Sequence, residues 1–195
     1  MYFVPRAILD SLWRVLRLDV ASASVFDRFW KFGAFLFAAS FVSGSVGYAL
    51  LKPFMRHRFV FPTPRVVWNH PVYAYEHIAL MAVVFATLAT LCVLSAPRLV
   101  GWKRHTATVL VIATTVAIGS PLCGLLWKFQ NLRAGYTEWN LHFLMELRSG
   151  ASQAFDLCWL VVLASIPYNM LAFAAAFGLM EFAFGSTRTA AGEDR

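Results

Sequence analysis

The sequence has little charge for its length. Only 14% of its 195 residues are Asp, Glu, Lys or Arg, whereas soluble domains carry about 25%. Apolar residues reach 59%, and the mean hydropathy is +0.62. This composition excludes a disordered chain and argues against a soluble globular domain. We therefore expect an integral membrane protein that crosses the bilayer several times.

Cysteine is scarce as well. The three cysteines, Cys92, Cys123 and Cys158, each lie inside or at the end of a different apolar segment, and none lies in a loop. No disulfide framework is therefore predicted between loops. The pattern also argues against a thiol-oxidising membrane enzyme, which needs reactive cysteine pairs near a loop. We expect small buried thiols instead.

The common catalytic signatures are missing. The sequence contains no His-Glu-x-x-His, Cys-x-x-Cys or Gly-x-Ser-x-Gly pattern and no glycine-rich phosphate loop. Its first residues do not form a basic region followed by an apolar run, so no cleavable signal is predicted. The Lys and Arg residues flank apolar segments rather than forming a basic patch, so no nucleic-acid partner is expected. These absences favour a non-catalytic protein.

Four apolar segments are long enough to cross a membrane. A span needs about 20 apolar residues, and the segments run from about 32–51, 78–96, 106–127 and 157–184. Trp, Tyr, Lys and Arg stand at their edges, as interfacial anchors do. The predicted fold is all-α: a four-transmembrane-helix bundle in a single membrane domain, residues 1–195, with a polar tail over 185–195.

Residues 6–20 precede the first span and have two different faces. One arc of a helix over these residues is apolar and includes Leu9, Leu12 and Leu16, and the opposite arc carries Arg6 and Arg14. This pattern predicts an amphipathic helix lying in the membrane interface. A cap packed on the bundle from outside the membrane is the alternative.

The distribution of basic residues predicts an orientation. If both termini lie on the inner side, ten of the 17 Lys and Arg residues fall on that side and seven on the outer side. The positive-inside rule favours this arrangement, although the basic run over 52–58 opposes it. We expect a bacterial inner membrane, with the mitochondrial inner membrane as the alternative.

Small residues recur at helical spacing in every span. Such residues allow close approach of helix backbones in lipid. They predict either a tight bundle within one chain or contacts between chains. The residues are Ala39, Ser40, Ser43, Gly44, Gly47, Ala82, Ala86, Thr90, Ala113, Ala117, Gly119, Ala174 and Gly178.

Two spans are expected to be broken by proline, at Ser120-Pro121 and at Pro167. Ser165 and Asn169 lie beside the second break. These polar side chains either repair the kink locally or line a path for a ligand or ion. Glu181 lies about one turn from the end of the last span, so it either reaches the interface or has a function in the membrane.

A set of His and Glu residues lies in the two long loops, which share one side of the membrane. The first loop holds His70, Glu76 and His77. In the second loop Glu138, His142 and Glu146 are spaced i, i+4 and i+8, so a helix would place them on one face. Imidazole and carboxylate groups on one face suit Zn or Fe.

The alternative for the second loop is a short interfacial helix over 139–147. Its apolar face would carry Trp139, Phe143, Leu144 and Leu147 toward lipid, and Glu138, His142 and Glu146 would face water. Spacing alone is a weak sign of a metal site. We expect this interfacial helix in the last loop between spans.

Together these features predict a non-catalytic accessory subunit of a multi-protein membrane complex. Its partner contacts would use the small-residue faces and the loop over 59–71, which is rich in aromatic residues and proline. One alternative is a homo-oligomeric channel, transporter or lipid-binding bundle. Another is a metal-dependent or redox enzyme that uses the His/Glu set. The expected partners are membrane lipids, including bound lipid, and other subunits or copies of this chain. A metal ion is expected only if the His/Glu set is a site.

Overall fold

The computed structural model describes residues 25–55, 70, 72–156 and 166–192, and this part of the chain is helical without a strand. Four of its helices are long and apolar enough to cross a membrane, which confirms the predicted four-helix membrane bundle. The amphipathic segment 6–20 lies outside the described residues. The helices are α2 (Val25–Met55), α4 (Tyr73–Ser95), α5 (Trp102–Arg133), α6 (Leu141–Asp156) and α8 (Ile166–Gly192).

The spanning helices are longer than the apolar segments that predicted them. α5 begins at Trp102 instead of residue 106 and ends at Arg133 instead of residue 127. Its 32 residues, at 1.5 Å each, measure about 48 Å, whereas the hydrocarbon core is about 30 Å thick. The charged turns at both ends of α5 therefore reach beyond the hydrocarbon. α8 likewise continues to Gly192, into the expected polar tail, and the expected start of this span, 157–165, lies outside the described residues.

The expected break at Ser120-Pro121 is wrong, because α5 continues through Pro121 without interruption. Proline removes one main-chain N–H from the helix but leaves its neighbouring turns bonded. Hydroxyl groups in this region bond to their own helix: Ser120 Oγ donates to the Val116 carbonyl at 2.7 Å, and Thr115 Oγ1 donates to the Val111 carbonyl at 2.7 Å. These bonds satisfy polar groups that lipid cannot satisfy.

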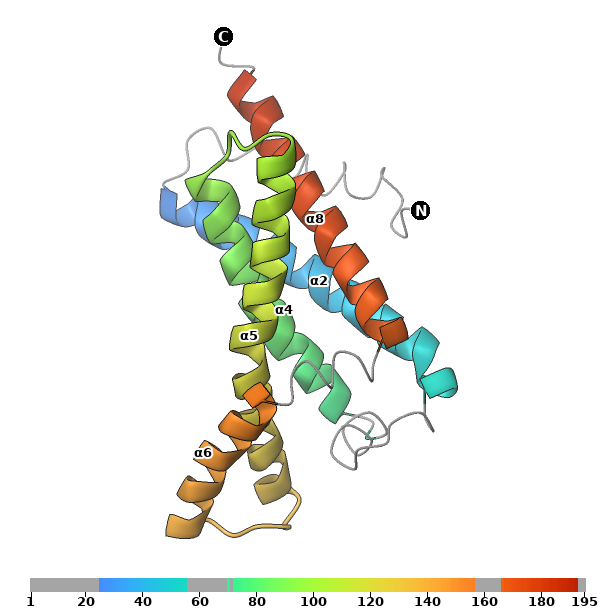
Figure 1. Ribbon diagram of the computed structural model, residues 1–195, viewed down its shortest axis with the longest axis vertical. Helices are drawn as coiled ribbons and strands as arrows, with labels where there is room; N and C mark the ends of the chain where they lie inside the picture. Colours follow the sequence, from blue (N-terminus) through green and yellow to red (C-terminus); the bar gives the residue numbers. More distant parts are fainter. Residues whose placement is uncertain (1–24, 56–69, 71, 157–165, 193–195) are drawn as a thin grey trace.

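α4 lies at the centre of the arrangement and packs against α2, α5 and α8. In Figure 1, α2 and α8 lie side by side and cross α4 and α5 at an angle. Within its most apolar stretch, 39% of α4 is buried inside the chain, against only 17% of α8. α8 is therefore the span that leaves most of its surface to lipid or to another protein.

The main apolar core lies toward the end of the bundle that holds the turn between α4 and α5. All four spans contribute to it. Alanines on α4 allow the neighbouring helices to approach closely. The buried members are Phe32, Leu36, Phe85, Ala86, Ala89, Val93, Val111, Leu179, Met180, Ala183 and Phe184.

A smaller cluster lies at the opposite end of α2 and α4, around Tyr48 and Ala74. The rings of Tyr48 and Tyr75 meet edge to face, with 5.2 Å between their centroids. A Cβ atom on Gly44 would stand 2.8 Å from Ile78 Cγ2. This distance is too short for a real contact, so Gly44 serves a contact within the chain, which is one of the two uses expected for its small-residue row.

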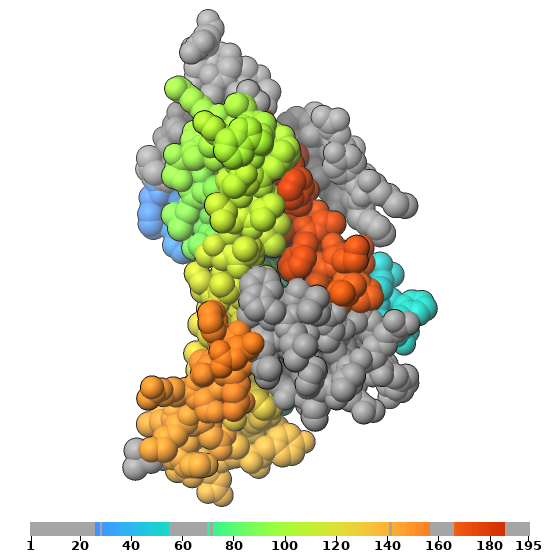
Figure 2. All heavy atoms as spheres, viewed as in Figure 1, coloured from blue at the N-terminus to red at the C-terminus, as the bar shows by residue number. Residues whose placement is uncertain are grey.

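α6 packs along the last turns of α5, and Figure 2 shows the two together at one end of the molecule. The helix begins at Leu141, and the Asn140 side chain caps it by accepting the Phe143 N–H at 2.9 Å. The expected lipid-facing position of Phe143 is wrong. Its side chain is only 1% exposed and meets Phe129 of α5 edge to face, with 5.7 Å between centroids.

Gly124 of α5 and Gly150 of α6 allow the two helices to touch. A Cβ atom on Gly124 would collide with the Gly150 carbonyl oxygen and would stand 2.6 Å from Ala154 Cβ.

Gly135, with φ of 76°, ends α5. The Gly135 N–H donates to the Leu132 carbonyl at 3.1 Å and the next N–H donates to the Asn131 carbonyl at 3.0 Å, which is a Schellman motif. This ending turns the chain back toward α6.

Candidate functional site

The first turn of α4 and the last turn of α5 join their polar side chains at one end of the bundle. Arg133 Nη2 donates to both carboxylate oxygens of Glu76, at 2.8 and 2.9 Å. Gln130 Nε2 donates to Glu76 Oε2 at 2.8 Å. A charged pair with a further N–H donor is stronger than a neutral hydrogen bond. We call Tyr73, Glu76, His77, Gln130 and Arg133 the Glu76 cluster.

Gln130 is the most buried member of this cluster, with 1% of its surface exposed. Its Nε2 also lies 3.4 Å from His77 Nδ1, and His77 Nδ1 lies 2.9 Å from the Tyr73 carbonyl oxygen. The Glu76 carboxylate determines the orientation of the amide, because the reverse orientation would place two oxygens together. This orientation leaves Gln130 Oε1 without a hydrogen-bond partner among the described residues.

His70, one of the candidate metal ligands, instead caps α4. Its Nδ1 accepts the main-chain N–H groups of Val72 and Tyr73, both at 3.2 Å, so this nitrogen is not free for a metal ion. The His70 ring stacks on Tyr73. Tyr73 in turn donates its hydroxyl to the Gln130 carbonyl at 3.3 Å, and the Arg133 guanidinium carbon lies 5.6 Å from its ring centroid. Tyr73 therefore connects the start of α4 with the end of α5.

A second set of polar contacts links α5 with α6. Lys128 Nζ donates to Glu146 Oε2 at 3.2 Å, and His142 Nε2 lies 3.5 Å from Glu146 Oε1. Glu138 is exposed and precedes α6. The expected row of Glu138, His142 and Glu146 on one helical face is incomplete, because the helix begins after Glu138.

The structure divides the predicted His/Glu set between these two places. Glu76 and His77 belong to the Glu76 cluster, which His70 adjoins, whereas His142 and Lys128 both contact Glu146. Within the described ranges, no three His, Cys, Asp or Glu side chains are grouped closely enough to hold a metal ion. The metal site therefore stays a prediction without a ligand set in this part of the chain.

Glu181 connects α8 with the first turn of α5. Its Oε2 forms an ion pair with Arg104 Nη2, and its Oε1 lies 3.1 Å from His105 Nδ1. The His105 ring stacks on Phe177, with 5.7 Å between centroids. The Glu181 carboxylate therefore lies between a guanidinium and an imidazole. It is held by two groups of a neighbouring helix.

The remaining intramembrane candidates lie at the start of α8. Pro167 is exposed and is the second residue of the described part of α8. Asn169 is half-buried. Ser165, and with it the expected repair of a kink, lies outside the described residues. Tyr168 extends to α2, where a Cβ atom on Gly44 would stand 3.4 Å from its hydroxyl oxygen.

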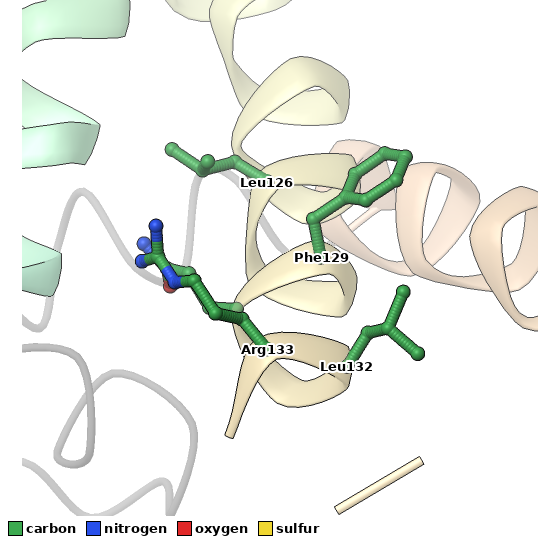
Figure 3. Close-up of a pocket in the computed structure, with 5 residues that line it drawn as sticks. Leu126, Phe129, Leu132 and Arg133 are labelled. Atoms are coloured by element: carbon green, nitrogen blue, oxygen red, sulfur yellow. The ribbon is translucent and has the colours of Figure 1, made fainter. Parts of the chain in front are cut away.

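An open cavity of about 290 Å³ lies beside the Glu76 cluster. Figure 3 shows Arg133 extending from α5 toward α4, whereas Phe129 points toward α6. The wall thus joins a cation and an amide to three apolar side chains. Its lining residues are Leu126, Phe129, Gln130, Leu132 and Arg133.

Sequence analysis did not single out Arg104, Lys128, Gln130 or Arg133 as site residues. Three of them were counted only as basic residues near the ends of spans. The available signal was that the predicted acids Glu76, Glu146 and Glu181 each needed a partner within the bundle. Choosing the partner requires knowing which helix ends are neighbours.

Comparison of the chain with protein-family models, with curated proteins and with solved structures finds no match.

Proposed function

We propose that this protein is a non-catalytic subunit of a membrane-protein complex and that α8 provides the face that meets a partner helix. One observation carries the proposal. A Cβ atom on Gly178 would meet no described atom within 4 Å, and Ala174, one turn earlier, is exposed. The small-residue row of α8 is therefore open within the described chain.

The other small-residue contacts make this opening informative. Cβ atoms on Gly44 and Gly124 would collide with a neighbouring helix of the same chain, and one on Gly119 would displace the flexible Met81 side chain of α4. Glycine in a helix is less favourable than alanine by about 1 kcal/mol, and close packing of helices offsets this loss in membranes. For Gly178 that packing is supplied by a partner helix.

The polar contacts agree with a structural role. Glu76, Glu146 and Glu181 are each paired with a cation on another helix. These pairs hold helix ends together, and the carboxylates in them are not free to act on a substrate. The proposed contact through the loop over 59–71 concerns residues that, apart from His70, lie outside the described part of the chain.

The test compares Gly178→Leu with Ala113→Leu, which adds a similar volume at an exposed small residue of α5. Each full-length chain is extracted from its native membrane in mild detergent and examined by native mass spectrometry. We expect the wild type and Ala113→Leu to retain one and the same partner chain of another sequence. Gly178→Leu should retain at least tenfold less of that partner. Equal retention of the partner by all three chains would overturn the proposal that α8 provides the partner face.

Two other outcomes decide between subunit and self-assembly. A wild type found only as a monomer would contradict the subunit proposal. A homo-oligomer without another chain would favour the second candidate, a channel, transporter or lipid-binding bundle. In that case the same Gly178→Leu substitution tests whether α8 joins the copies.

We also propose the bacterial inner membrane as the location, with both termini on its inner side. The ten-to-seven division of Lys and Arg supports this orientation. Lys103 lies in the first turn of α5 and Arg148 on α6, and both are exposed. In intact cells a membrane-impermeant maleimide should label Arg148→Cys, whereas it should label Lys103→Cys only after the membrane is opened. The reverse pattern would overturn the orientation.

A further inference from the structure

The cavity beside the Glu76 cluster lies at the depth of lipid headgroups. The apolar part of α5, residues 106–127, is about 33 Å long, which is enough to cross the hydrocarbon core. Gln130 and Arg133 follow this part at the end of the helix. The polar wall of the cavity therefore lies at the edge of the membrane, whereas Leu126 stands at the last apolar turn.

The polar wall presents the Arg133 cation, which the Glu76 carboxylate adjoins. Both bonds to Glu76 come from Nη2 of Arg133, so Glu76 does not use the donors on Nη1 and Nε. The Arg133 side chain is 59% exposed, and that of Glu76 is 26% exposed. Glu76 Oε1 accepts only one of the three hydrogen bonds to this carboxylate, so it can accept another. The site thus offers N–H donors of Arg133 and an acceptor of Glu76 in addition to the bonds that join the two side chains.

We propose that this cavity binds the headgroup of a phospholipid that carries a free amine, as phosphatidylethanolamine does. Arg133 holds the phosphate through its remaining N–H groups. The ammonium donates to the Glu76 carboxylate, and the first part of an acyl chain lies on Phe129 and Leu132. The charges of the site and of the headgroup are complementary, because each consists of one positive and one negative group. This inference does not depend on the α8 partner face.

The choice of headgroup gives a sharp test. Phosphatidylcholine has the same phosphate and net charge but no N–H donor. The delipidated full-length chain is mixed with equal amounts of short-chain phosphatidylethanolamine and phosphatidylcholine, and retained lipid is measured by native mass spectrometry. We expect at least fivefold more phosphatidylethanolamine. Equal retention of the two lipids would overturn the proposal.

Variants locate the binding. The double substitution Glu76→Gln with Arg133→Gln replaces the charged pair with two amides, so neither charge is left alone, and it should abolish the preference. Arg148→Gln, an exposed cation on α6 near the same end, should leave the preference unchanged. If the double variant fails to fold, Leu132→Asp keeps the Glu76–Arg133 pair and introduces a carboxylate into the apolar wall. It should reduce retention of phosphatidylethanolamine at least fivefold. A preference that survives in folded variants would contradict the site.

A competition arm separates the lipid from a soluble phosphate compound. Inorganic phosphate in the millimolar range should not displace the bound phosphatidylethanolamine, because the acyl chain contributes through the apolar wall. Displacement by phosphate, or by free phosphoethanolamine at a similar concentration, would show a site for a soluble ligand and would overturn the lipid proposal.

Discussion

The two ends of the bundle are built by different means. At the end that holds the α4–α5 turn, large apolar side chains from all four spans fill a continuous core, and Glu181 adds a polar link to α5. At the other end the apolar cluster is small, and contacts depend on the Glu76 cluster and on the touching backbones of Gly124 and Gly150. The stability of the first end therefore depends on the apolar volume that is buried there, whereas the stability of the other end depends on particular residues.

This difference has a physical cause in the membrane. Lipid tails are as apolar as leucine, so burying apolar side chains does little to select one helix arrangement over another. Close backbone contact and hydrogen bonds at helix ends do select one. We therefore expect conservative substitutions to be tolerated at the end that holds the α4–α5 turn. We do not expect them to be tolerated at the opposite end.

The largest expected effect is that of Gly124→Leu. The new side chain would collide with the Gly150 carbonyl and Ala154, so we expect α6 to separate from α5 and the free energy of unfolding to fall by about 3 kcal/mol. The midpoint of denaturant unfolding in detergent measures this change. Gly178→Ala, where no described atom lies within 4 Å, is the control and should not destabilise the isolated chain. A similar midpoint for both variants would remove the proposed contrast between the ends.

The next effect is that of Gln130→Glu. This substitution places a second carboxylate, at a position only 1% exposed, against Glu76. Repulsion and desolvation should reduce the free energy of unfolding by about 2 kcal/mol. Adding Glu76→Gln to the same chain restores one carboxylate and one amide and should recover most of the loss. The same unfolding assay checks it, and absence of rescue would mean that the loss has another cause.

A conservative substitution in the main core should have a smaller effect. Phe184 is fully buried among apolar neighbours. Phe184→Leu keeps an apolar side chain there, and neighbouring residues can repack around it, so we expect a loss of less than about 1.5 kcal/mol. Thermal unfolding in detergent measures this loss. A loss as large as that of Gly124→Leu would show that the core depends on particular side chains after all.

The Arg104–Glu181 pair should contribute less again. The two side chains are 22% and 24% exposed, so solvent and headgroups weaken their attraction. A double-mutant cycle of Arg104→Gln and Glu181→Gln should give a coupling of about 1 kcal/mol. Zero coupling would mean that the core alone holds α5 and α8 together at this end.

The smallest effect should come from His142→Ala. The His142 side chain is 78% exposed and lies 3.5 Å from Glu146, which is also paired with Lys128. We expect a change within about 0.5 kcal/mol in the free energy of unfolding. The same titration in the presence of zinc tests the predicted metal site. A midpoint that zinc raises for the wild type but not for His142→Ala would establish a metal ligand.

The candidate site was only partly predictable. Glu76, His77 and Glu181 stood out in the sequence because acids and histidines near the ends of apolar segments are rare and costly. Their partners did not stand out, because Gln130 follows Glu76 by 54 residues and meets it only through helix packing. His70 matched a metal ligand by residue type, but its ring lies where it caps the N–H groups of α4.

The sequence by itself determined the class of this protein and its four spans. The length of an apolar run is a local property, and the thickness of the bilayer core sets the length that a span needs. It also determined where the chain turns, through residues such as Gly101 and Gly135 that adopt positive φ. Only the tertiary structure decided which small residues meet within the chain, that Phe143 faces α5 and that Glu76, Glu146 and Glu181 each pair with a particular cation. These outcomes depend on which helix faces are neighbours, and helical spacing is the same for a face that meets lipid and for one that meets another helix.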